Sequence, residues 1–350
     1  MKKEEKRHQT LYRTYRPSDF DAVRGQQHVT DVLRRAIENK KFAHAYLFCG
    51  GRGTGKTSVA RILAKEIGVT DRDLYEIDAA SNRGIDDIRE LREGVLALPF
   101  ESPYKLYIID EAHMLTKDAW NAFLKTLEEP PAHCLFVMAT TERDKVPDTI
   151  QSRCEVYSFK QPTRAMLADI VGDIAKKEAY TLERSAAELI ALIAEGSFRD
   201  ALSLLQKVLA ASSGTHINLS DVEMVSGAPR GESIRVILSA IAKKDVSGAL
   251  AAIDAVVASH TDARVLTKLL IHRLRAVLLM RFAPDLIERY VRELSESDIA
   301  MVRELSKEPG IHSETLRALL DAYATMAYAA IPQLPLELAV IDVCGSTTVS

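Results

Sequence analysis

The chain has 350 residues, of which 47% are hydrophobic and 27% charged, a composition typical of folded globular proteins and not of disordered ones. Its net charge of −3 excludes a strongly basic nucleic-acid binder, so any contact with DNA must come from a local basic surface or from several subunits together. No apolar run reaches the roughly 18 to 20 residues that span a bilayer, and the charged segment at residues 1–10 precedes no signal-peptide-like stretch. We therefore expect a cytoplasmic protein with no membrane partner.

The first half of the chain alternates between strand-like and helix-like segments. Short apolar runs of the buried-strand type occupy residues 45–49, 106–109 and 135–138, whereas residues 58–67 and 117–129 show the apolar spacing of amphipathic helices. This alternation predicts an α/β domain with a mostly parallel sheet. Such sheets place their chemistry at the carboxyl ends of the strands.

From about residue 162 the strand signal disappears and helical spacing continues nearly to the end of the chain. A Gly-Ala-Pro break at residues 227–229 separates two helical regions. We therefore predict three domains, an α/β domain at 1–160, a small helical domain at 161–228 and a helical C-terminal domain at 229–350.

Residues 50–57 read GGRGTGKT and match the phosphate-binding loop pattern GxxxxGK[ST], with a predicted strand before it and a predicted helix after it. In such a loop the backbone N–H groups and the helix N-terminus surround phosphates, the lysine reaches the β- and γ-phosphates of ATP, and the last hydroxyl ligates Mg²⁺. The alternative, a chance glycine-rich turn, requires eight positions and both flanks to coincide. The residues predicted to bind the nucleotide are Gly50, Gly51, Arg52, Gly53, Thr54, Gly55, Lys56, Thr57 and Ser58.

An acidic pair, Asp110 and Glu111, follows the predicted strand at 106–109. An acidic pair in this place can simply cap the next helix. Together with a phosphate-binding loop, it predicts that Asp110 holds Mg²⁺ and that Glu111 polarises the attacking water. We expect His113 to be structural.

With these motifs the chain resembles the AAA+ superfamily and, within it, the clamp-loader branch, on SRC at 152–154, YRP at 15–17 and VRGQ at 23–26. Further strings make it similar to the gamma/tau family of bacterial DNA polymerase III. They are HAYLF at 44–48, EIDAAS at 76–81, KTLEEPP at 125–131, ATT at 139–141 and RDALSLL at 199–205. The similarity is dense from about residue 11 to 209.

The resemblance implies roles for five further residues. Thr141 stands at the sensor-1 position, near the γ-phosphate or the catalytic water, and Arg199 stands at sensor 2. Arg153 stands at the arginine finger, which acts in the neighbouring subunit's site. For an isolated arginine, a surface salt bridge would be the better interpretation. Val23 and Gln26 are expected to border the adenine.

The family resemblance has one departure. Gamma/tau proteins usually carry a four-cysteine zinc module between the helix after the phosphate loop and the next strand, but here only GVTDRD stands between Ile67 and Leu74. The cysteines, at positions 49, 134, 154 and 344, have no metal-ligand spacing, so we expect them to be small buried hydrophobic residues and expect no zinc.

The resemblance also implies partners: other clamp-loader subunits in a hetero-oligomer, expected to be pentameric, a sliding clamp, and primer–template DNA. Residues 82–89 match the stretch that presents a helix N-terminus to DNA, with Arg83 and Arg89 as candidates for phosphate contacts. A solvated face, salt-bridged to Asp86 and Asp87, is the alternative. The helices from residue 230 onward would form a collar between subunits, although their apolar stripes could form an internal core.

The predicted function is therefore that of an ATP-hydrolysing clamp-loader motor that loads the clamp onto primer–template DNA, with no polymerase site of its own. Little chain follows the helical region, which favours a gamma-like product or a truncated chain. Three alternatives remain: a small subunit similar to replication factor C, a nucleotide-binding scaffold that does not hydrolyse ATP, and another AAA+ remodeller. The strings at 44–48 and 125–131 argue against the first, and the complete set of Lys56, Thr57, Asp110 and Glu111 argues against the second.

Overall fold

The computed structural model describes residues 10–259, 261–286 and 296–345. Most of the charged N-terminal segment at 1–10, and positions 260, 287–295 and 346–350 of the predicted C-terminal helical domain, lie outside them. The contacts divide the chain into two units, one of residues 1–167 and 194–203 and one of residues 168–193 and 204–350. The separation of two helical domains at 161–228 and 229–350 stays a prediction.

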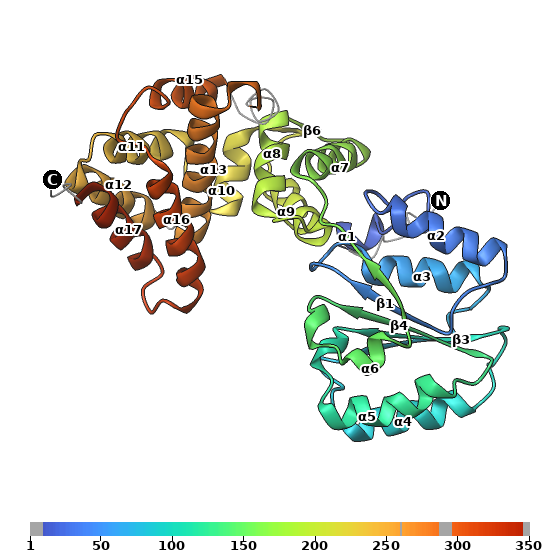
Figure 1. The fold of residues 1–350 in the computed structure, drawn as a ribbon. Coiled ribbons are helices and arrows are strands. Elements are labelled where there is room, and N and C mark those ends of the chain that lie inside the picture. The colour runs from blue at the N-terminus through green and yellow to red at the C-terminus, as the bar shows by residue number, and fades with distance from the viewer. Residues whose placement is uncertain (1–9, 260, 287–295, 346–350) are drawn as a thin grey trace. The chain divides into compact units, whose positions relative to one another are not determined.

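Five parallel strands form the sheet of the first unit, in the spatial order β2-β3-β4-β1-β5 (Figure 1). They are β1 (Ala45–Cys49), β2 (Leu74–Asp78), β3 (Lys105–Asp110), β4 (Cys134–Thr140) and β5 (Glu155–Ser158). Because β1 lies between β4 and β5, its neighbours in space are far from it in sequence. The strand order reverses at this position, and crevices at such points are where α/β sheets bind ligands.

Helices cover both faces of this sheet (Figure 1). The helical segments of the first unit are α1 (Leu11–Thr14), α2 (Gln27–Glu38), α3 (Lys56–Glu66), α4 (Ile85–Leu96), η1 (Ala112–Met114), α5 (Lys117–Glu128), η2 (Arg143–Lys145) and α6 (Asp148–Gln151). All residues of β1 and β4 are buried, as expected for strands covered on both faces. The predicted mostly parallel α/β fold is confirmed.

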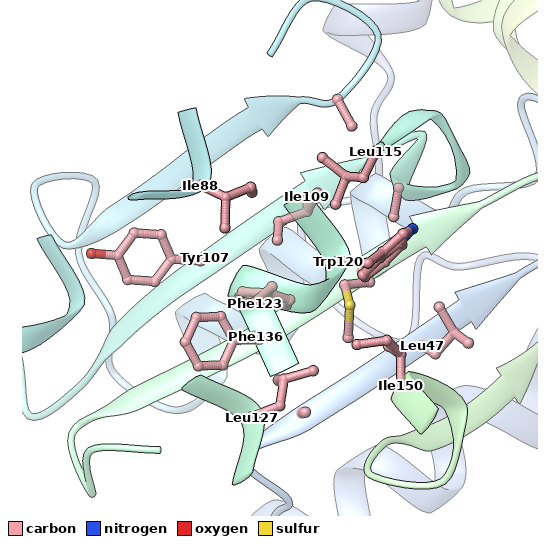
Figure 2. Packing of buried hydrophobic residues seen from close by; sticks show 14 of the residues in the cluster. Leu47, Ile88, Tyr107, Ile109, Leu115, Trp120, Phe123, Leu127, Phe136 and Ile150 are labelled. Atoms are coloured by element: carbon pink, nitrogen blue, oxygen red, sulfur yellow. The ribbon is translucent and has the colours of Figure 1, made fainter. Parts of the chain in front are cut away.

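Alternate residues of the central strands supply two separate hydrophobic cores. Tyr46 and Phe48 face α2 and α3, whereas Leu47 faces α4 and α5. Figure 2 shows the second core, where Phe123 of α5 lies against Phe136 of β4, with 5.2 Å between the ring centroids in an edge-to-face arrangement. This packing fixes the strand ends, and therefore the side chains that follow them.

The second unit is mainly helical. Its helices, two of which begin or end in the first unit, are α7 (Arg164–Lys177), α8 (Arg184–Ile193), α9 (Phe198–Ala211), α10 (Leu219–Ser226), α11 (Gly231–Ala242), α12 (Val246–Ala258), α13 (Ala263–Phe282), α15 (Glu296–Leu305), α16 (Ser313–Thr325), η3 (Met326–Tyr328) and α17 (Leu334–Gly345). A short parallel pair, β6 (Thr181–Leu182) and β7 (His216–Ile217), departs from the prediction that strands end near residue 162. Two-residue strands are too short to produce an alternating pattern.

The long helix α13 is the centre of the C-terminal helices, and it contacts α11, α15 and α16. Arg273 on α13 makes a two-pronged ion pair with Asp298 on α15, at 2.6 and 3.1 Å, and both side chains are nearly buried. About two turns further on, Arg281 donates to the backbone carbonyls of Ser306, at 2.8 Å, and Ile311, at 2.5 Å. These bonds satisfy carbonyls after the end of α15. No helix in the described part of the chain combines the length and the apolar character that crossing a membrane requires.

Candidate nucleotide-binding site

The loop of residues 50–55 joins β1 to α3, in the strand–loop–helix context that the motif requires. Its first residue continues the sheet, because the N–H of Gly50 donates to the carbonyl of Thr140 on β4, at 3.1 Å. Gly53 has a φ of +68°, and a Cβ built on it would lie 2.1 Å from Oγ of Ser197. Glycine is therefore required at this position both by the backbone conformation and by the close approach of Ser197.

Lys56 is the first residue of α3, and only 6% of its surface is exposed. Its Nζ donates to the carbonyls of Gly50 and Gly51, at 2.8 Å each, so the amine lies within the curve of the loop. Burial lowers the pKa of Lys56, and the carboxylates of Glu111 and Asp110 oppose that effect. A buried cation enclosed by a glycine-rich loop is an arrangement that a phosphate chain would stabilise.

Thr57 and Asp110 come together at the carboxyl ends of β1 and β3. Thr57 Oγ1 donates to Asp110 Oδ2 at 2.9 Å, and the backbone N–H of Glu111 donates to Asp110 Oδ1 at 3.0 Å. A hydroxyl and a carboxylate are hard oxygen donors, which Mg²⁺ prefers, together with phosphate oxygens and water. The residues present therefore fit the magnesium site expected from the sequence.

Glu111 has a φ of +48°, a left-handed conformation that is uncommon for a residue with a side chain and that tends to occur at functional sites. Its Oε2 accepts a hydrogen bond from Thr141 Oγ1 at 3.3 Å. The predicted water-polarising residue and the predicted sensor-1 residue are thus in direct contact.

The sequence did not predict the side-chain contacts that His113 makes beside Glu111 and Thr141. His113, whose side chain is 8% exposed, lies with Nδ1 3.5 Å from Glu111 Oε2 and 3.1 Å from Thr140 Oγ1, and with Nε2 3.3 Å from Glu142 Oε1. That His113 is structural stays a prediction. No spacing in the sequence connects Thr140 or Glu142 with the acidic pair, because β4 is separated from β3 by a whole helix.

Arg199 also belongs to the first unit, since residues 194–203 are part of it. The N–H of Phe198 donates to the carbonyl of Gly53 at 3.0 Å, which attaches the start of α9 to the phosphate loop. The positive charge of Arg199 contributes to the lowered pKa of Lys56, after burial as the main cause. The structure thus gathers Lys56, Thr57, Asp110, Glu111, Thr141 and Arg199 around one loop.

Val23 and Gln26 are both buried. Gln26 Nε2 donates to the carbonyl of Lys160 at 2.7 Å, and Gln26 Oε1 accepts from the N–H of Lys160 at 3.1 Å. The amide of Gln26 therefore ties the segment before α2 to the chain after β5. The predicted contact of both residues with adenine stays a prediction.

Comparisons with known proteins point to one family. A family model described as "DNA polymerase III, delta subunit" matches residues 69–163, and one described as "DNA polymerase III clamp loader subunit, ATPase lid domain" matches residues 167–214. The DNA polymerase III subunit gamma of Buchnera aphidicola is 31% identical over 334 residues, covering 89% of this chain and 90% of that protein. The chain belongs to the DNA polymerase III gamma/tau family. The family resemblance noted in the sequence is confirmed.

Other members of the gamma/tau family extend beyond the matched region. The subunit tau of Bacillus subtilis is 38% identical, with 97% of this chain and 64% of that protein covered. The gamma/tau subunit of Mycobacterium tuberculosis is 36% identical, with 93% and 59% covered. Among solved structures, the RuvB Holliday junction branch migration motor of Thermotoga maritima has a TM-score of 0.52 and 25% identity, covering 65% of this chain and 79% of that one.

Arg153, the finger residue that the family resemblance implies, contacts α5 and α6 instead of the phosphate loop. Its Nη2 lies 2.7 Å from Oε1 of Glu128, and its Nη1 donates to the carbonyl of Thr149 at 2.7 Å. The side chain is 35% exposed. A role in a neighbouring subunit's site stays a prediction, and the ion pair with Glu128 is the alternative it must be tested against.

The predicted DNA-contacting arginines lie at the start of α4, and both are exposed. Arg89 pairs with Asp86 at 2.9 Å, and their side chains are 61% and 88% exposed. This contact agrees with the alternative interpretation, a solvated face held by salt bridges. Arg83 precedes the helix, and its carbonyl accepts from the N–H of Thr116 at 3.1 Å. An exposed pair of this kind contributes little to stability, so Arg89 can exchange Asp86 for a phosphate at small cost.

Proposed function

We propose that this chain binds ATP with Mg²⁺ and hydrolyses it as a motor subunit of the DNA polymerase III clamp loader, which places a sliding clamp on primer–template DNA. The observation that carries the proposal is the pair of contacts at the strand ends, Thr57 with Asp110 and Glu111 with Thr141, beside Lys56. In a gamma/tau-family chain, these contacts support a metal-binding role for the first pair and a water-activating role for the second.

Each group has a role in the chemistry. The N–H groups of the loop and Lys56 bind the phosphate chain, and Thr57 and Asp110 would hold Mg²⁺, which supplies charge neutralisation when bound. Oε2 of Glu111 accepts a hydrogen bond from water and orients its oxygen toward the γ-phosphorus. The new P–O bond forms as the bond to the β,γ-bridging oxygen breaks, giving ADP and inorganic phosphate, and the proton of the water passes to solvent by way of Glu111.

In this proposal Arg153 acts in the site of a neighbouring subunit and exchanges its ion pair with Glu128 for the nucleotide there. A guanidinium inserted from a neighbouring subunit would stabilise the charge that develops on the transferred phosphoryl group, an effect worth roughly 10³ to 10⁵ in rate in other phosphoryl-transfer systems. Such an arrangement makes hydrolysis depend on assembly of the subunits. In the hetero-oligomer expected from the family resemblance, it would link ATP turnover to clamp release.

Subunit contacts have a candidate surface in the second unit. On α17, the side chains of Leu334, Leu338 and Ile341 are 41 to 51% exposed, while Leu336 and Val340 of the same helix are buried. An exposed apolar row opposite a buried one is typical of a helix that packs on two sides. This supports, for the collar predicted from residue 230 onward, a role in joining subunits to one another.

Substitution of Lys56 tests the nucleotide site. Lys56→Ala removes the buried cation, so we expect loss of ATP binding, of hydrolysis and of clamp loading, measured in the complex reconstituted with its partner subunits. Lys65→Ala, an exposed lysine at the other end of the same helix, is the matched control and should behave as the unmodified chain. ATP turnover by Lys56→Ala equal to that of Lys65→Ala would refute the assignment.

The scaffold alternative makes a different prediction for the intact chain. A subunit that only binds nucleotide would assemble and bind ATP, yet addition of primed DNA and clamp would not stimulate turnover. Measuring nucleotide binding and stimulated turnover on the same complex therefore separates the two functions.

A further inference from the structure

Tyr12 of the N-terminal helix α1 lies against Arg199 at the start of α9. The Cζ atom of Arg199 is 5.5 Å from the centre of the Tyr12 ring, within the range of a cation–π contact. Helix α1 is held in place by the buried side chain of Leu11. Both residues belong to the first unit, so the contact lies within the module that contains the phosphate loop.

The backbone of Arg199 is fixed from a second direction. Phe198, the preceding residue, donates its N–H to the carbonyl of Gly53 at 3.0 Å. Ser197 lies where a Cβ of Gly53 would otherwise be, and its Oγ accepts from the N–H of Asp200 at 3.2 Å, which caps α9. Because these contacts fix the backbone of Arg199, mainly its side chain can change conformation.

Arg199 lies close enough to two other cations to affect their titration. It contributes to the lowered pKa of Lys56, and also to that of Arg16, where burial and Arg61 are the larger causes. In the described ranges of the chain, no carboxylate is paired with its guanidinium. An aromatic face can hold a guanidinium and leave its charge and its N–H donors free. A carboxylate would neutralise the charge and occupy the donors.

We propose that Tyr12 is a positioning residue for Arg199: its ring holds the guanidinium by one face, which keeps the N–H donors available to the terminal phosphate of a bound nucleoside triphosphate. This rests on the proposed function of the site. The ring of Tyr12 also lies 5.8 Å from Cζ of Arg13, its neighbour in sequence, so the experiment must separate the two arginines.

The test compares a triphosphate with a diphosphate. ATPγS and ADP, each with Mg²⁺, are titrated calorimetrically into the full chain and its variants. Tyr12→Leu keeps apolar bulk but removes the aromatic face, and the usual strength of exposed cation–π contacts corresponds to a two- to fivefold loss, roughly, in ATPγS affinity. ADP affinity should stay unchanged, because ADP lacks the terminal phosphate. Tyr12→Phe keeps the aromatic face and should match the unmodified chain for both nucleotides.

Two further variants show whether the effect passes through Arg199. In an Arg199→Ala background, Tyr12→Leu should have no additional effect on ATPγS binding, since neighbouring groups that act together are not additive. Arg13→Ala should leave the ratio of the two affinities unchanged. If Tyr12→Leu fails to fold, as judged by its melting curve, Tyr12→Met is judged by the same criteria.

The proposal is overturned if Tyr12→Leu weakens ATPγS and ADP equally, if it weakens neither, or if its effect persists without Arg199. Failure of the proposed function gives a different result. In that case the unmodified chain binds neither nucleotide, or Lys56→Ala binds both as well as the unmodified chain does.

Discussion

Asp73 is fully buried just before β2, where its carboxylate organises the chain between α4 and β3. Its Oδ1 accepts from the N–H of Phe100 at 2.6 Å, and its Oδ2 accepts from the N–H groups of Glu101 and Ser102, at 2.9 and 2.8 Å. Asp73→Asn replaces one acceptor oxygen by an NH₂ donor that would face these N–H groups. We therefore expect the substitution to destabilise the first unit.

The magnitude follows from the pKa of Asp73. Burial raises it, but the hydrogen bonds from the N–H groups of Glu101, Phe100 and Ser102 outweigh burial and lower the pKa from 3.8 to about 2. A shift of this size corresponds to about 2 kcal/mol of stability at neutral pH, and screening by water around the loop reduces it to between about 1 and 2 kcal/mol. Because the pKa is lower in the folded state, this contribution is complete above pH 3.8 and is lost as the pH falls toward 2.

Urea unfolding of the unmodified chain and of Asp73→Asn measures this difference. The two free energies of unfolding should differ by a constant amount from pH 7 to pH 5, and by about half of it at pH 3. Asp71→Asn, an exposed aspartate two positions earlier, should differ from the unmodified chain at neither pH. A destabilisation by Asp73→Asn that does not change with pH would show that shape, and not the charge of Asp73, holds the loop.

The remaining predictions concern hydrolysis and DNA. Glu111→Gln keeps the acceptor for Thr141 but cannot take up a proton, so ATP binding should be retained while turnover in the reconstituted complex falls by at least about 10²-fold, and turnover near that of the unmodified chain would remove Glu111 from the mechanism. The double variant Arg83→Ala and Arg89→Ala should weaken binding of primer–template DNA by the assembled complex and flatten its dependence on salt concentration. Unchanged binding and an unchanged salt slope would exclude these arginines from the DNA interface.

The candidate nucleotide-binding site shows what a sequence can predict. The motif at 50–57 and the acidic pair after a buried strand required that Thr57 and Asp110 meet, because the carboxyl ends of parallel strands lie at one edge of a sheet. The observed hydrogen bond between them agrees with that geometry. The motif also predicts the position of Lys56, because the loop and the helix after it restrict the conformation of the first helical residue.

Contacts between distant segments could not be predicted in this way. Gln26 bonds to Lys160, 134 positions away, and Tyr12 contacts Arg199, although no periodicity relates either pair. These contacts depend on how loops fold over the sheet edge, which side-chain packing decides. The left-handed backbone conformation of Glu111 could not be predicted either, because glutamate has no preference for that conformation.

Arg153 has two possible roles, as one half of a surface ion pair or as the arginine finger expected from the family resemblance. As a surface ion pair, Arg153 and Glu128 should be equivalent, so that Glu128→Ala and Arg153→Ala reduce turnover to the same small extent. As a finger, Arg153 acts on the neighbouring subunit's nucleotide, and only its own substitution should abolish turnover. Arg34→Ala, which breaks another exposed ion pair, with Asp21, serves as a control for the loss of a surface arginine.

The most direct test is the ATPase rate of the chain reconstituted with its partner clamp-loader subunits, with and without primed DNA and clamp. We predict strong stimulation by DNA and clamp, retained in Glu128→Ala and lost in Arg153→Ala. A complex that assembles and binds ATP, yet shows no stimulated turnover, would contradict the proposal that this chain is a motor.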